Sequence, residues 1–550
     1  MKIIIEDTTL RDGEQGVGIA FTPEDRVHVI TELDELGVGA VETGYYSPDE
    51  NELNSRLLSL PCRDKLTAFC GTCRPGERAD GDPTLVSLAQ SGYRRAALFG
   101  KTMKTMVSAV LRAEPEENLR MIRESVKFLS SAGVRVTFDA EHIFDAVKTD
   151  PDYAFAALRA AADGGAAELM LCDTVGGSLP GEIADITKMA VKAFPGIIIG
   201  IHCHNDAGLA EACVLAAADA GASAVQGTIS GIGERCGNAN LNTVIPLLQL
   251  KRGYECVPPE NLPRLTHTAR YISEVANLRF DEREPFVGGY AFRHKAGTHI
   301  DATIKLPGSF EHIDPAAVGN SRGMVISGLS GRAAIVSRIK ALTGAVPDKN
   351  DPRVIGAAAR IKQLENEGYV FDAADASLTL VLLEALGTRK RFFEVLKYQI
   401  TITEGSQSGA VLISPELAAE YEADPTRRAP EFYENNNACS AVVKVRVGGE
   451  YRITADEGNG PVNALDLALR KSLRHFYPEI GGMYLTDYKV RVLTTGAATA
   501  SGVRVLIESS DGSDTWRTVG VSSDVVEASC KALSDSIEYF LMQRKSEKGE

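Results

Sequence analysis

The sequence predicts an α/β protein with a (β/α)8 barrel at its start, small and mainly helical linker subdomains in the middle, and an α+β domain at its end. Three observations lead to this prediction. Short apolar, β-branched segments alternate with longer amphipathic segments up to about residue 252. The alternation stops at Pro258–Pro259, and half-exposed strand patterns recur after about residue 391. The expected domains are therefore 1–255, 256–390 and 391–550.

The first region contains eight strand patterns, each followed by a helical pattern. The strands are expected at residues 2–6, 39–42, 65–70, 94–99, 134–138, 168–172, 197–202 and 223–228. The helices are expected at residues 23–36, 50–59, 83–91, 115–132, 151–164, 180–193, 207–221 and 239–252. Regular alternation is typical of parallel sheets, and eight units in about 250 residues is the size of a closed barrel. A doubly wound open sheet is the alternative, because periodicity does not determine closure.

The remaining regions have different patterns. Helices are expected at 260–277, 331–343 and within 353–386, with a loop rich in Gly, His and Lys before residue 331. In the last region, strands are expected at 395–403, 440–455, 487–493, 502–509 and 515–520, and helices at 461–475 and 523–543. Residues 424–438 are polar and are expected to form a loop.

Composition excludes several classes of function. The net charge of −15 argues against non-specific nucleic-acid binding and against an anionic membrane surface. No apolar run reaches the roughly 18 residues of a membrane span, and the first residues form a strand pattern instead of a signal peptide. The ten cysteines have no framework spacing, so we expect reduced thiols in a cytoplasmic protein.

His202 and His204 are the most informative residues of the chain. They end an apolar strand pattern, and residues two apart on a strand point to the same face. Asp12, after the first expected strand, adds a carboxylate at the same rim of a barrel, and Asn238 adds an amide. These oxygen and nitrogen ligands suit Zn2+, Mn2+, Co2+ or Mg2+ and do not choose among them.

Further polar residues follow the other expected strands. They are Arg11, Glu42, Asp139, Glu141 and Thr174. Each alone could be a helix cap or a loop residue, but barrel strands bring their carboxyl ends to one rim, where active sites lie. Arg11 places a cation beside the metal, which suits an oxygen that gains negative charge. An ion pair between Arg11 and Glu42, or another carboxylate at a strand end, is the structural alternative, and both interpretations can hold together.

Two other segments have weaker patterns. Gly231–Gly237 lies between a strand and a helix like a phosphate-binding loop, but its spacing does not match the dinucleotide motif. Outside the barrel, His299 with Asp301 offers a base and a carboxylate that could orient it. A surface loop is the alternative for this second segment.

The chain resembles the isopropylmalate, homocitrate and citramalate synthases, a group of metal-dependent barrels that condense acyl-CoA. Asp7–Gln15, His202–Asp206 and Gly233–Asn238 are similar to the three signatures of that group. Phe138–His142, Leu171–Thr174, His294–Asp301 and Glu311–Pro315 resemble the long form of citramalate synthase, as does Asp456–Leu465 in the last domain. The resemblance covers roughly residues 3 to 543.

The resemblance implies a role for each site residue. Asp12, His202 and His204 would hold the metal, with Asn238 nearby, and Arg11 would polarise a keto oxygen. Glu42, Asp139, Glu141 and Thr174 would contact substrate, with Glu141 also catalytic. His299, with Asp301, would take a proton from the methyl group of acetyl-CoA. A homodimer is implied, because the accessory segment can come from the partner subunit in this group.

The implied reaction is a Claisen-type condensation of acetyl-CoA with a 2-oxo acid, followed by thioester hydrolysis. Pyruvate would give citramalate, an entry to isoleucine synthesis, and isoleucine would be the feedback ligand of the last domain. Three positions depart from the citramalate pattern: Phe310 replaces a Tyr, Glu42–Pro48 replaces a segment with Gly and Trp, and Gly328 replaces a Glu. The departures leave 2-isopropylmalate and homocitrate synthesis open, because one methylene changes selectivity by only ~1–3 kcal/mol.

Two rival hypotheses remain. A hydroxyacyl-CoA lyase or a 4-hydroxy-2-oxo acid aldolase would use the same barrel, although such enzymes generally lack the His299 segment and the terminal domain. A protein that only senses a metabolite would also keep the barrel. The intact set of Arg11, Asp12, His202, His204 and Asn238 argues against this second rival.

Overall fold

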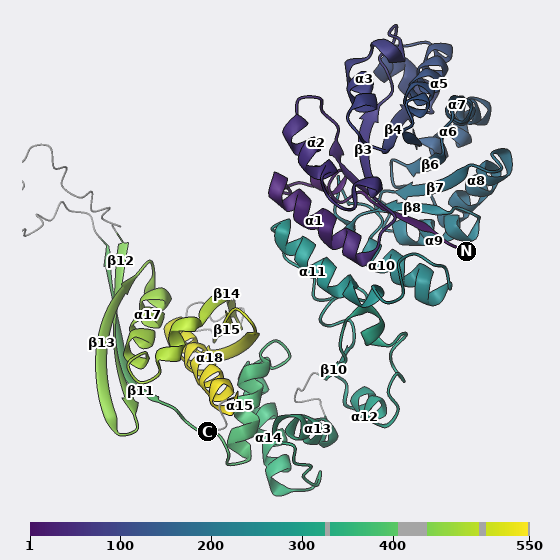
Figure 1. Ribbon diagram of the computed structural model, residues 1–550. Coiled ribbons are helices and arrows are strands. Elements are labelled where there is room, and N and C mark those ends of the chain that lie inside the picture. The colour runs from purple at the N-terminus through teal and green to yellow at the C-terminus, as the bar shows by residue number, and fades with distance from the viewer. Residues whose placement is uncertain (325–330, 405–436, 494–501, 548–550) are drawn as a thin grey trace, which may run out of the picture. The chain divides into compact units, whose positions relative to one another are not determined.

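The structure is a computed structural model that describes residues 1–324, 331–404, 437–493 and 502–547 (Figure 1). It divides into two compact units. The first unit comprises Met1–Arg293 and Glu311–Gly323, and the second comprises His294–Phe310 and Met324–Glu550. Within the described residues, no helix has the length and apolar character that crossing a membrane requires.

The first unit is built on a closed barrel of eight parallel strands in sequence order. The strands are β1 (Ile4–Asp7), β2 (Ala40–Tyr45), β3 (Leu66–Gly71), β4 (Arg95–Lys101), β5 (Arg135–Glu141), β6 (Glu168–Asp173), β7 (Ile198–Cys203) and β8 (Ala224–Gly227). Strand β1 closes the barrel against β8, with Ile4 opposite Ala224 and Asp7 opposite Gly227. This closure confirms the predicted barrel and excludes the open sheet.

The barrel helices follow the predicted alternation and surround the strands (Figure 1). They are α1 (Pro23–Leu36), α2 (Asn51–Leu58), α3 (Pro83–Gln90), α5 (Pro115–Ser131), α7 (Pro151–Gly164), α8 (Pro180–Ala193), α9 (Ala210–Asp219) and α10 (Leu241–Pro246). Two short helices, α4 (Lys104–Met106) and α6 (Ile143–Thr149), are additional, and α11 (Leu265–Val275) packs beside α1.

Local sequence explains where these helices begin and end. In α1, the Thr22 side chain accepts a hydrogen bond from the Asp25 amide while Asp25 accepts one from the Thr22 amide, and Pro23 occupies the first helical position. Gly37 ends the helix with φ +93°, a left-handed conformation that favours glycine. Leu33 and Leu36 are fully buried against the barrel. Burial of each such side chain contributes about 1.5–3 kcal/mol.

The second unit combines helices with two antiparallel sheets. The helices are α12 (Gly297–Lys305), α13 (Arg332–Thr343), α14 (Pro352–Asn366) and α15 (Asp375–Ala385). One sheet contains β11 (Glu394–Glu404), β12 (Asn437–Val447) and β13 (Glu450–Gly458) and is packed by α17 (Pro461–Leu473). The other contains β14 (Tyr484–Val492), β15 (Val503–Ser510) and β16 (Thr515–Ser522) and is packed by α18 (Val525–Glu547).

Three local predictions need correction. The expected loop before residue 331 contains α12. The single strand expected at 440–455 is a hairpin, because Gly448 and Gly449 have φ +55° and +97° and form a two-residue turn. The helical stretch at 353–386 is interrupted between α14 and α15. Of the polar loop expected at 424–438, residues 437–438 begin β12 and the others lie outside the described residues, as does Gly328.

Candidate metal centre and active site

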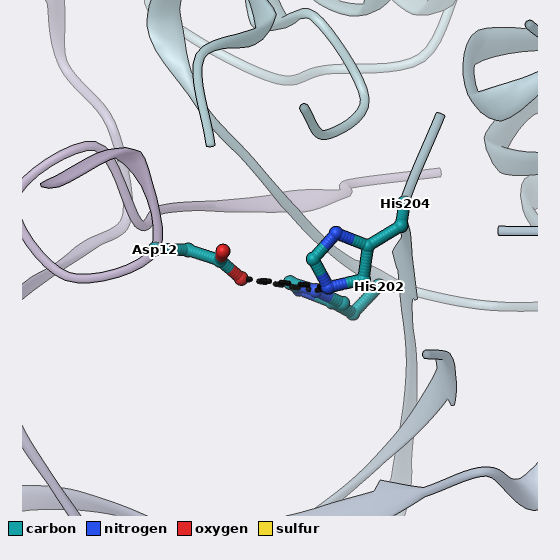
Figure 2. Close-up of side chains that lie close together, drawn as sticks. All are labelled: Asp12, His202 and His204. Atoms are coloured by element: carbon teal, nitrogen blue, oxygen red, sulfur yellow. Dashed lines mark hydrogen bonds and ion pairs between the residues drawn. The ribbon is translucent and has the colours of Figure 1, made fainter. Parts of the chain in front are cut away.

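The end of β7 and the loop after β1 bring together two imidazoles and a carboxylate. His202 Nε2 lies 3.3 Å from Asp12 Oδ2 and 3.5 Å from His204 Nε2. His204 Nε2 lies 3.9 Å from the same Asp12 oxygen. Figure 2 shows the three side chains pointing toward one another, and all three are buried. The predicted ligand set Asp12, His202 and His204 is thus one cluster whose donor atoms lie within 4.8 Å of one another.

The donor atoms of this cluster are in a state that suits a cation. Burial alone would raise the pKa of Asp12, but the charge of Arg11 and the bond to His202 hold it below its ordinary value. Burial and the neighbouring His202 lower the pKa of His204 to about 4. Asp12 Oδ1 and His204 Nδ1 are buried and have no hydrogen-bond partner among the described residues. An ionised carboxylate and a neutral imidazole are the protonation states that a divalent metal needs in its ligands.

Asn238 joins the cluster from the loop after β8. It forms a β-bridge with His204, and its Nδ2 donates to the Ile232 carbonyl at 3.1 Å. Its Oδ1 is buried and has no partner in the described part of the chain. The close fit requires glycine at Gly233, where φ is +156° and a Cβ would lie 2.1 Å from Asn238 Nδ2. The Gly-rich loop therefore shapes the position of Asn238.

Arg11 connects the metal cluster to the second strand. Its Nη1 lies 2.9 Å from Asp12 Oδ2, its Nε lies 2.6 Å from Glu42 Oε2, and its guanidinium lies 4.1 Å from the centre of the Phe69 ring. Burial would lower the pKa of Arg11, but the charges of Glu42 and Asp12 raise it above its ordinary value. Arg11 is therefore a permanent cation. It contacts Glu42 and Asp12 of the metal cluster at the same time.

A cavity of about 240 Å3 opens over these groups. Its aromatic wall consists of Tyr45, Phe69 and Phe99, with the Phe69 and Phe99 rings stacked 5.2 Å apart. The residues that line it are Arg11, Asp12, Gln15, Tyr45, Phe69, Phe99, Asp139, Glu141, Cys172, Thr174, His202, His204, Glu234 and Arg235. A cation, a metal cluster and a small aromatic wall therefore face one space.

Of the other predicted substrate contacts, the structure places Asp139, Glu141 and Thr174 around this cavity. Burial and the nearby Glu42 raise the pKa of Asp139, whose Oδ1 has no partner among the described residues. Glu141 forms an ion pair with Lys101. Thr174 Oγ1 accepts a hydrogen bond from the His142 amide at 2.9 Å. Glu42 holds Arg11 and is not one of the cavity-lining residues.

Comparison with known proteins identifies the family. Three protein-family models match the chain. The family described as "HMGL-like" matches residues 2–272, and the family described as "Homocitrate synthase post-HMGL domain-like" matches residues 286–368. The family described as "LeuA allosteric (dimerisation) domain" matches residues 432–541. An "(R)-citramalate synthase" of Synechocystis sp. is 43% identical over 97% of this chain and 95% of its own length. Proteins of the same name from Aquifex aeolicus and Geobacter sulfurreducens are 42% and 40% identical, each over 99% of this chain and 99% and 98% of their own lengths.

The chain belongs to the citramalate synthase family. Membership confirms the resemblance that the sequence motifs indicated, and with it the class of enzyme. The three family matches follow one another along the chain, from the barrel through the accessory segment to the terminal domain.

The accessory segment of this family member carries His299 and Asp301 on α12. His299 is exposed and stacks on Phe310, with ring centres 4.1 Å apart and an interplanar angle of 19°. Asp301 pairs with Lys305 at 2.6 Å. Phe310, which departs from the citramalate pattern, therefore provides a flat apolar face for His299. Both predicted residues belong to the second unit.

Several residues of the site were missed by sequence analysis. Lys101, Tyr45, Phe69 and Phe99 all lie at or near strand ends, which is the signal that could have found them. Gln226 has a different signal, because it is a polar residue inside the buried strand β8. Aromatic residues at strand ends are ordinarily core residues, so only the folded cavity distinguishes them.

Proposed function

We propose that this member of the citramalate synthase family condenses acetyl-CoA with pyruvate to give citramalate and CoA. The observation that carries the proposal is the buried cluster of Asp12, His202 and His204 beside the permanent cation Arg11. The full-length similarity to proteins named (R)-citramalate synthase supports pyruvate as the oxo acid.

Asp12, His202 and His204 would hold a divalent metal, with Asn238 beside them. When bound, the metal would supply Lewis-acid polarisation of the oxo acid. Mn2+, Mg2+, Zn2+ and Co2+ all suit this donor set. Arg11 stabilises the negative charge that develops on the keto oxygen, because its guanidinium is held in place by Glu42 before the reaction begins.

His299 takes a proton from the acetyl-CoA methyl group. Asp301 follows two residues later on α12, where it pairs with Lys305. The resulting enolate carbon attacks the keto carbon of pyruvate, and the keto oxygen takes up one proton, equal to the one that His299 removed, and becomes the hydroxyl group of the product. Water then cleaves the thioester bond and releases CoA as a free thiol. Asp139, Glu141 and Thr174 line the cavity and contact the substrates during these steps, with Glu141 serving as a further catalytic carboxylate.

We further propose a homodimer with isoleucine as the feedback ligand of the terminal domain. The match of residues 432–541 to an allosteric dimerisation domain supports a dimer and an allosteric ligand. Isoleucine as that ligand follows from the resemblance to citramalate synthases. A cytoplasmic location is supported by the ten free cysteines. We also propose that the chain divides into three domains, 1–255, 256–390 and 391–550.

The test is release of free thiol from acetyl-CoA by metal-loaded protein, across pyruvate, 2-oxoisovalerate, 2-oxobutyrate and 2-oxoglutarate. We expect release with pyruvate and much weaker release with the larger acids. Preference for a larger acid would keep the mechanism and replace the substrate. No release with any of the four acids, whichever of the four metals is loaded, would overturn the proposal.

A further inference from the structure

Gln226 is a buried amide below the metal cluster, with 1% of its surface exposed. It lies on β8, opposite His202 of β7 in the strand register. Its Oε1 lies 3.0 Å from His202 Nδ1. With the amide oxygen as acceptor, Nδ1 carries the proton and the Nε2 lone pair faces Asp12 and His204.

The other end of the same amide contacts the arginine side of the site. Gln226 Nε2 donates to Glu42 Oε1 and to Glu6 Oε2, each at 3.4 Å. Glu42 in turn holds Arg11 at 2.6 Å, and Arg11 lies 2.9 Å from Asp12. Asp12 lies 3.3 Å from His202, and this contact completes a closed circuit of five side chains. The five are Gln226, Glu42, Arg11, Asp12 and His202.

We propose that Gln226 is a positioning residue that holds the metal ligand His202 and the substrate-binding Arg11 in one hydrogen-bonded circuit. The inference rests on the proposed function for the role of Arg11. The role of His202 depends only on metal binding. Gln226 acts through these two residues and does not itself line the cavity.

A side chain at position 226 needs both a hydrogen-bond donor and an acceptor to keep its contacts with His202, Glu42 and Glu6. An apolar side chain would leave His202 Nδ1 without its partner, so the imidazole would lose its fixed tautomer and orientation. A carboxylate would keep the acceptor for His202 but would face Glu6 and Glu42 with no donor. The two kinds of substitution therefore separate the two halves of the circuit.

The experiment compares Gln226→Leu, Gln226→Glu and wild type in the full-length protein. Affinity for Mn2+ and for Zn2+ is measured by calorimetry or chelator competition, and the KM and kcat for pyruvate are measured by thiol release. Gln249→Leu is the matched control, because Gln249 also bonds one buried partner, the Val257 amide at 3.1 Å, outside the site. We expect this control to behave as wild type in both assays.

We expect Gln226→Leu to bind metal about 10- to 100-fold more weakly, the usual cost of losing a partner of a metal-ligating histidine. We expect Gln226→Glu to keep metal affinity and to raise the KM for pyruvate about tenfold, since Glu42 loses its donor and Arg11 loses its support. Should Gln226→Leu fail to fold, Gln226→Met replaces it, because its chain length matches glutamine.

Wild-type metal affinity in Gln226→Leu or its Met substitute would overturn the inference, as would an unchanged KM in Gln226→Glu. The metal titration needs no turnover, so it separates the two proposals. If the wild type releases no thiol with any oxo acid, the proposed function fails, while loss of metal affinity in Gln226→Leu still supports the His202 half of the circuit.

Discussion

The barrel contains two buried clusters of charged and polar groups that differ in how completely they are satisfied. In the upper cluster, at the carboxyl ends of the strands, Asp12, His204 and Asn238 each keep a buried polar atom without a partner among the described residues. Toward the other end, Arg95 lies 2.7 Å from Glu6, and Glu168 binds both Arg135 and Thr137. The two carboxylates of this lower cluster, Glu6 and Glu168, have a hydrogen-bond partner for every oxygen.

The difference separates groups that serve the fold from groups that serve a ligand. A buried ion pair with all its hydrogen bonds holds strands together, and removal of one partner is costly. A buried polar atom without a hydrogen-bond partner costs free energy in the folded protein and is retained where a ligand satisfies it. Of these two clusters, the one with unsatisfied atoms among the described residues is the one that holds the candidate metal ligands.

The largest effect is expected for His202→Ala, which removes one of two imidazoles at the metal cluster. We expect loss of bound metal and a fall in kcat of about 10³-fold or more. Metal content and thiol release with pyruvate are the measurements. His267→Ala, at an exposed histidine that pairs with Glu32, is the control. Full metal content and turnover in His202→Ala would remove the upper cluster from the mechanism.

The lower cluster is tested by Arg95→Met. This change leaves Glu6 and Glu168 without their shared cation, and we expect the free energy of unfolding to fall by about 3–5 kcal/mol. Urea unfolding monitors the loss, and calorimetry monitors metal affinity, which we expect to stay within a few-fold of wild type. A stable Arg95→Met protein with lost metal affinity would reverse the assignment of the two clusters.

Arg11→Lys tests whether Arg11 of the upper cluster acts in catalysis or only supports Glu42. Lysine keeps the charge but cannot contact Asp12 and Glu42 with one planar fork. We expect kcat to fall about 10²- to 10³-fold with metal content retained. Arg56→Lys, at an exposed arginine that pairs with Glu24, is the control. An unchanged kcat would show that Arg11 only supports Glu42.

The pKa of His204 gives the upper cluster a pH dependence of stability. Its folded pKa is about 4, whereas an unfolded histidine titrates near 6.5. Between these values the unfolded chain binds more protons, so stability falls as pH falls from about 6.5 to 4, by up to about 3 kcal/mol. Metal-free wild type should lose more stability between pH 7.5 and pH 4.5 than metal-free His204→Gln. Equal losses in urea titrations would contradict the assignment.

The smallest effect is expected at the aromatic wall. Phe99→Leu enlarges the cavity without removing the ring of Phe69 from Arg11. We expect the kcat/KM ratio of 2-oxobutyrate to pyruvate to rise about tenfold, the size of a single-methylene discrimination. Phe155→Leu, at a helix ring stacked on Phe194, is the control. An unchanged ratio would place the selectivity elsewhere.

Sequence patterns predicted the barrel closely because each of its elements is encoded locally. The alternation of apolar strands with capped helices located all eight strands and their helices, for example α1 between Pro23 and Leu36. The same approach failed where a turn or a break is decided by few residues. Gly448–Gly449 divides one expected strand into two, and α12 lies in an expected loop.

For the site, sequence patterns predicted which chemical groups are present: two imidazoles two residues apart, and acids and an arginine after successive strands. These positions follow from the side-chain period of a strand and from the common rim of parallel strands. The folded structure shows which atoms meet. The contact between Gln226 and Glu42, through which His202 is joined to Arg11, depends on barrel closure. Closure brings β8 next to β1, and no local pattern encodes a contact between residues 184 apart.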